Sequence, residues 1–308
     1  MGPVQVTGPM TCPGRPGRPH LLKSRERIRG LVVAALAELL RQWRSDLAAW
    51  AIPEHITAAA PDSPWVLPRQ VFARRADRLR QAPSGPSYQR EIEALHQPGS
   101  VLDVGAGAGA ACLPLALRTT TLTAVDSDRE MLTLLAERAR AAGLNPQAVT
   151  GRWPDVAGQV GPADLVTCHN VLYNVPSLVP FIEALTRHAR RRVVVELTAA
   201  HPLTALNPLW LLFHGLTRPE GPTAADVLAI LDAMGLRARH TEWNRPGEAD
   251  YSTLSELAEV TRRRLCLPPE RTDEVAAALR DTGLGQRQAA DLGTSGRAVV
   301  TIWWEGSA

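Results

Sequence analysis

The sequence predicts an α/β fold built on a parallel sheet. From Gly99 onward, short apolar runs typical of strands alternate with longer amphipathic segments, as in parallel sheets. A buried strand at Val101–Val104 runs directly into Gly105, Gly107 and Gly109, where the chain must turn sharply. The 308 residues are 45% hydrophobic and 21% charged, which is the composition of a globular protein.

Two segments precede the sheet. Proline and glycine dominate the first residues, which are therefore expected to be disordered. Ser24 is expected to cap a helix that runs to about Trp50, because apolar residues recur there at helical spacing. The next stretch is interrupted by prolines and contains one short amphipathic helix, Arg69–Gln81. The predicted parts are a disordered tail (1–20), an N-terminal helical or lid segment (21–97) and the sheet domain (98–308).

The remaining elements follow from apolar periodicity and turn residues. The predicted strands are 101–104, 122–125, 147–150, 163–168, 192–197, 236–243 and 298–304. A helix is expected after the glycine turn, and further helices at 129–142, 177–190 and 222–234. Ser177 is a candidate N-cap, and Gly143 and Gly235 end their helices. Residues 252–282 also have a helical pattern, so a helical insertion at about 250–292 is expected before the last strand.

The glycine turn and Asp126 form a candidate nucleoside site. Backbone N–H groups at the start of the helix after the turn would face a ligand. A carboxylate at the carboxyl end of the second strand can accept hydrogen bonds from two vicinal hydroxyls. The spacing Gly105-x-Gly107-x-x-Ala110 also fits the dinucleotide fingerprint, so the glycines alone leave two classes of cofactor open.

Asp103 distinguishes the two classes of cofactor. It lies two residues before the first glycine, in an otherwise apolar strand. A carboxylate there suits a cation and is a poor neighbour for a pyrophosphate, which prefers helix N–H groups. S-adenosylmethionine (SAM) carries a sulfonium and an ammonium and no phosphate, so the motif favours SAM over NAD(P).

Asp103-x-Gly105-x-Gly107-x-Gly109, followed by Asp126, closely resembles the first two motifs of class I SAM-dependent methyltransferases. The resemblance covers roughly residues 99–243 and 297–305. It implies a doubly wound, seven-stranded, mostly parallel sheet whose last strand runs antiparallel between the fifth and sixth. It also implies a lid formed by the N-terminal helical segment.

The resemblance and the strand ends together predict the SAM contacts. Trp153 is expected to stack on the adenine or, as an equal alternative, to belong to the core. Arg152 stands where many relatives carry an acidic residue. The predicted cofactor residues are Asp103, Gly105, Ala106, Gly107, Gly109, Asp126, Ser127, Trp153, His169 and Asn170.

The segment 168–176 resembles the fourth motif of methyltransferases that act on small molecules, and lacks the Asn/Asp-Pro-Pro-aromatic signature of enzymes that methylate nucleobase amines. Methyl transfer requires the nucleophile, the methyl carbon and the sulfur to be collinear. A base helps only when the acceptor is a hydroxyl or a protonated amine. The candidate bases are His169, which is favoured, with His201, His214 and the carboxylate of Glu196 as alternatives.

Aromatic residues in the lid and beyond the strand ends are candidates for the acceptor site, with a core position as the alternative for several of them. The predicted substrate residues are Trp65, Phe72, Tyr173, Asn174, Trp210 and His214. Arg74, Arg75 and Arg78 near the lid are candidates for holding an acidic substrate or the SAM carboxylate. The clusters 190–192 and 262–264 are instead expected at a helix end and on a solvated face.

Charge, cysteine content and hydropathy limit the classes of binding partner that are expected. The formal net charge of +3 does not by itself indicate nucleic acid, and Lys23 is the only lysine. The four cysteines are scattered, which is typical of free thiols and predicts no metal site. No apolar run approaches the ~20 residues that span a bilayer, and no secretory segment is evident. A cytoplasmic enzyme, monomeric or homodimeric, is expected, with no nucleic-acid or membrane partner.

The favoured interpretation is therefore a SAM-dependent methyltransferase with a small-molecule acceptor. A methyltransferase acting on RNA or protein is one alternative. A non-catalytic SAM-binding protein is the other, because the glycine motif and Asp126 indicate binding and not turnover.

Overall fold

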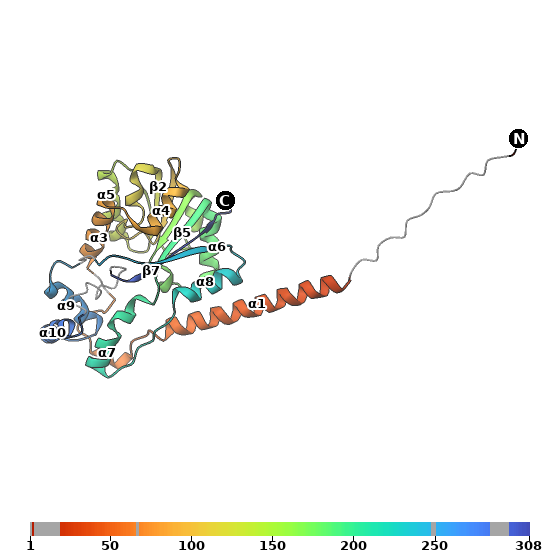
Figure 1. The fold of residues 1–308 in the computed structure, drawn as a ribbon. Coiled ribbons are helices and arrows are strands. Elements are labelled where there is room, and N and C mark those ends of the chain that lie inside the picture. The colour runs from red at the N-terminus through yellow and green to blue at the C-terminus, as the bar shows by residue number, and fades with distance from the viewer. Residues whose placement is uncertain (1, 3–18, 66–67, 248–250, 284–295) are drawn as a thin grey trace.

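The computed structural model describes residues 2, 19–65, 68–247, 251–283 and 296–308. Within these ranges the chain forms a seven-stranded sheet of order β3-β2-β1-β4-β5-β7-β6 (Figure 1). The strands are β1 (Gly99–Val104), β2 (Thr119–Asp126), β3 (Gln147–Thr150), β4 (Ala163–His169), β5 (Ala189–Thr198), β6 (Arg239–Asn244) and β7 (Ala298–Glu305). Neighbours from β3 to β5 pair in parallel, and β7 is antiparallel to both β5 and β6. The predicted fold class and strand order are confirmed.

Helices surround the sheet. The α-helices are α1 (Pro19–Ala48), α2 (Glu54–Ala59), α3 (Arg69–Gln81), α4 (Gly85–Ala94), α5 (Arg129–Ala141), α6 (Leu178–His188), α7 (Asn207–His214), α8 (Ala224–Ala233), α9 (Leu254–Arg264) and α10 (Thr272–Asp281). The 3₁₀ turns are η1 (Leu113–Arg118), η2 (Ala157–Gln159), η3 (Leu172–Asn174), η4 (Pro202–Leu206) and η5 (Pro269–Arg271). No helix of the described ranges is long and apolar enough to cross a membrane.

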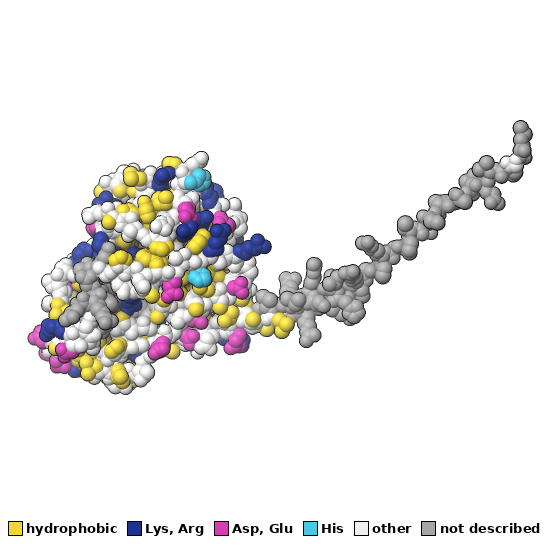
Figure 2. All heavy atoms as spheres, in the orientation of Figure 1, with side chains coloured by type: hydrophobic (Ala, Val, Ile, Leu, Met, Phe, Trp, Pro, Cys, Tyr) yellow, Lys and Arg dark blue, Asp and Glu magenta, His cyan; other side chains and the backbone are white. Residues whose placement is uncertain are grey.

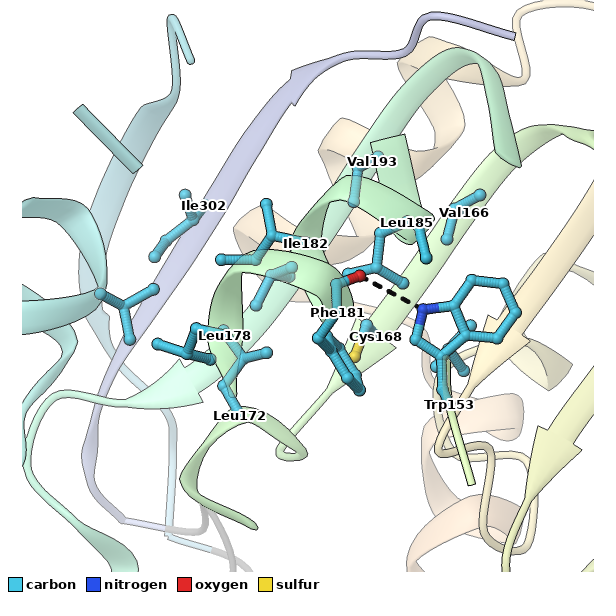
Figure 3. Close-up of a cluster of buried hydrophobic side chains, with 14 of the residues drawn as sticks. Trp153, Val166, Cys168, Leu172, Leu178, Phe181, Ile182, Leu185, Val193 and Ile302 are labelled. Carbon is cyan, nitrogen blue, oxygen red and sulfur yellow. Dashed lines mark hydrogen bonds between the residues drawn. The ribbon is translucent and has the colours of Figure 1, made fainter. Parts of the chain in front are cut away.

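The core has two layers because successive strand side chains point to opposite faces. On β4, Val166 packs with α1, α6 and α8, whereas its neighbour Leu165 packs with α3, α4 and α5. Figure 3 shows the first layer, in which Phe181 and Ile182 of α6 lie over β4 and β5. A third apolar cluster joins α2, α7, α9 and α10 away from the sheet.

Helix α1 starts earlier than predicted. It begins at Pro19, a residue that suits the first turn of a helix because its missing N–H would have no partner there. Ser24 therefore lies within the helix and does not cap it. The far end of α1 packs beside α8, with Trp43 fully buried, while its start projects away from the body (Figure 1). The disorder predicted for residues 1–20 falls mostly outside the described residues.

The glycine turn is not followed by an α-helix. Gly105, Gly107 and Gly109 have φ of 74°, 50° and 94°, and a right-handed helix cannot contain such residues. The chain instead passes through turns into the short η1. The ligand would therefore meet the N–H groups of a loop and not those of a helix end.

Both arginine clusters, 190–192 and 262–264, lie in other positions than predicted. Arg190–Arg192 lie in β5, because α6 already ends at His188, and Arg192 pairs with Glu93 at 3.2 Å. Arg262 is 1% exposed and not on a solvated face. Its guanidinium donates to the Asp62 carboxylate at 2.7 Å and also pairs with Glu259, so its burial is compensated by opposite charge.

Candidate cofactor and acceptor site

A cavity of about 1010 Å³ opens at the carboxyl ends of the parallel strands and is lined on one side by residues of α3 and α4. Ligands of open parallel sheets bind at this edge. Five strand ends contribute to it, through residues 104–108, 125–128, 151–155, 169–171 and Glu196, and the stretch 174–177 adds to the wall. Ligand pockets span roughly 300–1,000 Å³, so this cavity, at the upper end of that range, is large enough for a nucleoside cofactor.

The glycine loop brings the backbone close to the cavity. Gly105 has positive φ, and a Cβ there would lie 2.2 Å from Cγ2 of Val171. Gly107 also lines the cavity, together with Ala106. Gly109 does not line it; a Cβ there would lie 2.8 Å from Leu113, so this glycine is needed for the turn. The prediction that Gly109 contacts the cofactor is not supported.

Asp126 ends β2 with its carboxylate at the cavity, beside Ser127. Its Oδ2 accepts the N–H of Gly107 at 2.8 Å, and its Oδ1 accepts the N–H of Asp128 at 2.8 Å. A carboxylate offers about four lone-pair positions, so two remain for the vicinal hydroxyls of a ribose. The residues present therefore fit the nucleoside part of SAM.

Asp103 lies beneath the loop, and it is not a lining residue. It is 1% exposed, and its Oδ2 has no hydrogen-bond partner among the described residues. Burial raises its pKa to about 7, against the lowering effect of Cys112 and His169. Its carboxyl group is therefore ionised only in part at neutral pH, and because Asp103 does not line the cavity, the predicted direct contact with SAM is not present.

His169 is held among carboxylates at the end of β4. Its Nε2 lies 2.9 Å from Oε1 of Glu91, although the alignment is not that of a hydrogen bond. Glu91 is 1% exposed and accepts the hydroxyl of Thr167 at 2.6 Å. Burial lowers the pKa of His169, but Glu91, Glu196 and Asp103 outweigh it and raise the value to about 9. The ring is therefore an imidazolium at neutral pH.

Glu196 lies at the end of β5 and pairs in register with His169 of β4. It accepts the hydroxyl of Ser87 at 2.6 Å and the guanidinium of Arg245 at 2.6 Å. Burial raises its pKa, but Arg245 and His169 lower it below the ordinary value. Glu196 lines the cavity as an ionised, paired carboxylate.

Three of the side chains that pair with His169 or Glu196 were not predicted from the sequence: Ser87, Glu91 and Arg245. The first two lie on α4, and no helix was predicted there. Pro86 in the first turn of α4 marks a helix start. No sequence signal marks the buried face of α4, because that face carries Ser87 and Glu91 where an apolar stripe would be expected.

His201 is separated from the other two predicted catalytic residues. It lines a second cavity of about 320 Å³ and stacks on Trp50, with 4.2 Å between ring centroids. Its Nδ1 accepts the N–H of Leu203 at 3.3 Å, and burial lowers its pKa to about 4. With Nδ1 already engaged, the ring cannot serve as the predicted base.

The predicted acceptor residues divide into two groups. Trp65, Phe72 and Asn174 line the main cavity, and Tyr173 lines the second. Trp210 and His214 of α7 line neither cavity. Trp210 is 4% exposed in the third cluster, and Nε2 of His214 lies 2.7 Å from the carbonyl oxygen of Leu265. Their prediction as pocket walls is wrong, because α7 packs onto α9 and α10.

Trp153 belongs to the core in this structure (Figure 3). Its Nε1 donates to the carbonyl of Phe181 at 3.3 Å, and its ring meets His188 edge-on at 4.9 Å. The ring is 9% exposed but still borders the cavity. Stacking on the adenine remains a prediction for Trp153.

The remaining predicted residues lie at the cavity or near it. Asn170 lines it with φ of 60°, and its N–H donates to the carbonyl of Glu196 at 2.7 Å. Arg75 lines it beside Phe72, whereas Arg74 is paired with Glu256 at 2.7 Å. Among the described cysteines, Cys112, Cys168 and Cys266 are free and buried; Cys12 lies outside the described residues.

Comparison with known proteins agrees with this geometry. Residues 101–192 match a family model described as a methyltransferase domain, and this range runs from β1 into β5. No curated protein sequence matches the chain.

Solved structures of similar fold include magnesium protoporphyrin IX methyltransferase from Synechocystis PCC 6803 with bound S-adenosylhomocysteine (18% identity, 77% of this chain and 84% of that chain, TM-score 0.44). A putative methyltransferase from an antibiotic biosynthesis pathway of Anabaena variabilis is similar over 70% of this chain and 95% of that chain (17% identity, TM-score 0.45). At these identities, the ligands and pathways named describe those proteins and not this chain.

Proposed function

We propose that this chain, whose residues 101–192 match a methyltransferase domain, is a class I SAM-dependent methyltransferase that acts on a small molecule. The observation that supports this acceptor class is the cavity of about 1010 Å³ beneath α3 and α4. Side chains of α3 and α4 line it, among them Phe72 and Leu79, so part of its wall is apolar. A small acceptor can enter this recess and contact that wall.

In this proposal the chain binds and orients, and SAM supplies a methyl group on a sulfonium that is already a good leaving group. Asp126 takes the ribose hydroxyls, and the glycine loop lets the backbone approach the nucleoside. Trp65 and Phe72 offer apolar surface to the acceptor from the lid side. Holding two reactants in line at contact distance accounts for a large part of the rate of such a displacement.

The charge states favour an acceptor that reacts without losing a proton to the predicted bases. His169 is an imidazolium and has no lone pair to offer. Glu196 is a weak base because Arg245 lowers its pKa. His201 lies in the other cavity. A neutral amine, a thiolate or a phenolate meets this condition, whereas an alcohol does not.

Calorimetric titration with SAM, S-adenosylhomocysteine and NAD(P) tests the cofactor. We expect the wild-type protein to bind the first two and not NAD(P). Asp126→Ala should weaken S-adenosylhomocysteine binding by roughly tenfold or more, because hydrogen bonds to a charged group contribute about 1.5–3 kcal/mol. The exposed Asp232 on α8 supplies the control, Asp232→Asn, which should bind like the wild type. NAD(P) binding without SAM binding would overturn the proposal.

The acceptor class is tested separately. Filter binding of a single-stranded RNA at two salt concentrations should show no steep salt-dependent affinity. On the face shown in Figure 2, basic side chains lie among acidic and apolar ones and form no continuous belt. Release of S-adenosylhomocysteine in the presence of a panel of small amines, thiols and phenols should reveal turnover. Turnover with RNA or protein alone would contradict the small-molecule acceptor, and SAM binding without any turnover would indicate a non-catalytic binding protein.

A further inference from the structure

The carboxylate that the sequence predicted for the cationic part of SAM is not at the cavity. Asp103 lies beneath the glycine loop, does not line the cavity and is ionised only in part at neutral pH. SAM and S-adenosylhomocysteine both carry an ammonium on their amino-acid end, and a cation that leaves water needs an opposite charge nearby. Another carboxylate at the cavity has to supply that charge.

The carboxylates that line the cavity in the described part of the chain are Glu91, Asp126, Asp128, Asp155 and Glu196. Asp126 already accepts two backbone N–H groups and is assigned to the ribose. Asp128 caps α5 and pairs with Arg69 at 3.2 Å. Asp155 is exposed and follows β3, which is the edge strand of the sheet. Glu91 and Glu196 remain as candidates.

Glu91 lies beside the position from which Asp103 was expected to act. Its Oε1 accepts the hydroxyl of Thr167 at 2.6 Å, and Thr167 of β4 pairs in register with Asp103 of β1. Glu196 ends β5, which is one strand farther from β1 and from the nucleoside at the end of β2. Glu91 is therefore the carboxylate closer to the glycine loop.

The carboxylate of Glu91 is buried with only part of its hydrogen-bonding capacity used. It is 1% exposed, and both of its contacts fall on Oε1. These are the hydroxyl of Thr167 and, without hydrogen-bond alignment, Nε2 of His169 at 2.9 Å. No described residue donates a hydrogen bond to Oε2. A buried acceptor without a partner is unfavourable, and an ammonium brings three donors.

The local charge balance also favours one more cation. His169 and Arg245 supply two positive charges. Glu91 and Glu196 supply two negative charges, and Asp103 adds a fraction of a third. Of the two glutamates, Glu196 is the better compensated, because a guanidinium donates to it at 2.6 Å in hydrogen-bond geometry.

We propose that Oε2 of Glu91 binds the ammonium on the amino-acid end of SAM and of S-adenosylhomocysteine, in place of Asp103. This inference rests on the proposed function, because it puts SAM in the cavity. Glu91 belongs to α4 and lies outside the residues 101–192 that match the methyltransferase model. The N-terminal helical segment then contributes a charge to the cofactor site as well as part of its wall.

Two analogues of S-adenosylhomocysteine test the inference by calorimetry. The deamino analogue, 4-(5′-deoxyadenosin-5′-ylthio)butanoate, keeps the carboxylate and lacks the ammonium. The decarboxylated analogue, 5′-deoxy-5′-(3-aminopropylthio)adenosine, keeps the ammonium and lacks the carboxylate. Wild-type protein should bind the deamino analogue about tenfold or more weakly than S-adenosylhomocysteine, because hydrogen bonds to charged groups are strong.

Glu91→Gln should weaken S-adenosylhomocysteine and the decarboxylated analogue roughly tenfold to a hundredfold, and the deamino analogue less than about twofold. Binding of the deamino analogue also shows that the variant is folded. A loss confined to the two ligands with a carboxylate would assign the effect to the charge of His169 and overturn the inference. An equal loss for all three ligands, or no loss, would overturn it too.

Glu93→Gln, on the same helix but about half exposed and outside the cavity lining, is the matched control and should change no affinity. Thr167→Val removes the hydroxyl that orients Oε1 of Glu91 and should show the same selectivity with a smaller loss, which keeps the test available if Glu91→Gln does not fold. Glu196→Gln should preserve the preference for S-adenosylhomocysteine over its deamino analogue. Loss of that preference in Glu196→Gln but not in Glu91→Gln would overturn the inference.

The two proposals fail separately in these experiments. Wild-type protein that binds S-adenosylhomocysteine and its deamino analogue equally retains the proposed cofactor and overturns the role of Glu91. Wild-type protein that binds none of the three ligands would overturn the proposed function, and the role of Glu91 with it.

Discussion

At the scale of single residues, four ionisable side chains meet at the ends of β4 and β5: Glu91 and Glu196 are buried, and His169 and Arg245 are largely buried. Burial alone would neutralise such groups. Two close ion pairs compensate for this burial: Nε2 of His169 lies 2.9 Å from Oε1 of Glu91, and the guanidinium of Arg245 lies 2.6 Å from Oε2 of Glu196. The acceptor therefore meets a fixed arrangement of charges and not a free general base.

Replacing Glu91 by Gln should lower the pKa of His169 from about 9, because the largest favourable charge on the imidazolium is removed. NMR titration of the His169 ring measures this directly. Glu93→Gln is the matched control on the same helix: Glu93 is about half exposed and pairs with Arg90 and Arg192. An unchanged His169 titration in Glu91→Gln would show that Glu91 does not hold the proton on His169.

At the scale of elements, the connection from β1 to β2 depends on backbone conformation more than on any side chain. Gly105 combines a φ of 74° with a space that Val171 already fills, so no other residue fits there. Gly143, just beyond α5, has a φ of 82°, but a Cβ added there would meet nothing within 4 Å. The two glycines therefore separate the effect of conformation from the effect of contact.

Gly143→Ala should cost about 1–2 kcal/mol of stability, the penalty for a side chain in the left-handed region, and leave binding of S-adenosylhomocysteine intact. Gly105→Ala should cost more and weaken binding at least about tenfold, because the loop must shift to relieve the contact with Val171. Urea unfolding and calorimetry measure the two quantities. Wild-type affinity in Gly105→Ala would contradict the role given to this loop.

At the scale of the whole molecule, the proton on His169 makes the free energy of unfolding depend on pH. His169 has a pKa of about 9 in the folded protein and an ordinary value of 6.5. The folded state therefore binds more protons between these values, and its stability falls as pH rises from 6.5 to 9. Asp103, with its pKa of about 7, and His201, at about 4, titrate mainly below this window.

Urea unfolding of the wild-type protein should therefore show a loss of about 1–3 kcal/mol between pH 6.5 and 9.5. The variant His169→Gln lacks the titrating ring and should lose clearly less over the same interval. Thermal unfolding at the same two pH values gives an independent check. Parallel pH dependence in the two proteins would show that the proton on His169 does not contribute to stability.

The fold and the cofactor end of the site could be predicted from the sequence because their signals are local. Apolar alternation marks the strands, three glycines within five residues mark the sharp turn, and Asp126 follows its strand directly. The carboxyl ends of parallel strands then lie along one edge whatever else the chain does. The helix α3 was likewise predicted with its bounds, since its amphipathic pattern is complete in itself.

What only the tertiary structure decided is which side chains face that edge from distant parts of the chain. Glu91 approaches His169 from a helix whose buried face is polar, and Arg245 reaches Glu196 from beyond β6. His201 and Trp210 are a few residues apart in sequence, yet one lines the second cavity and the other packs under α9 and α10. A residue's own neighbours set its local conformation, whereas its partners and charge state depend on packing between elements far apart in the sequence.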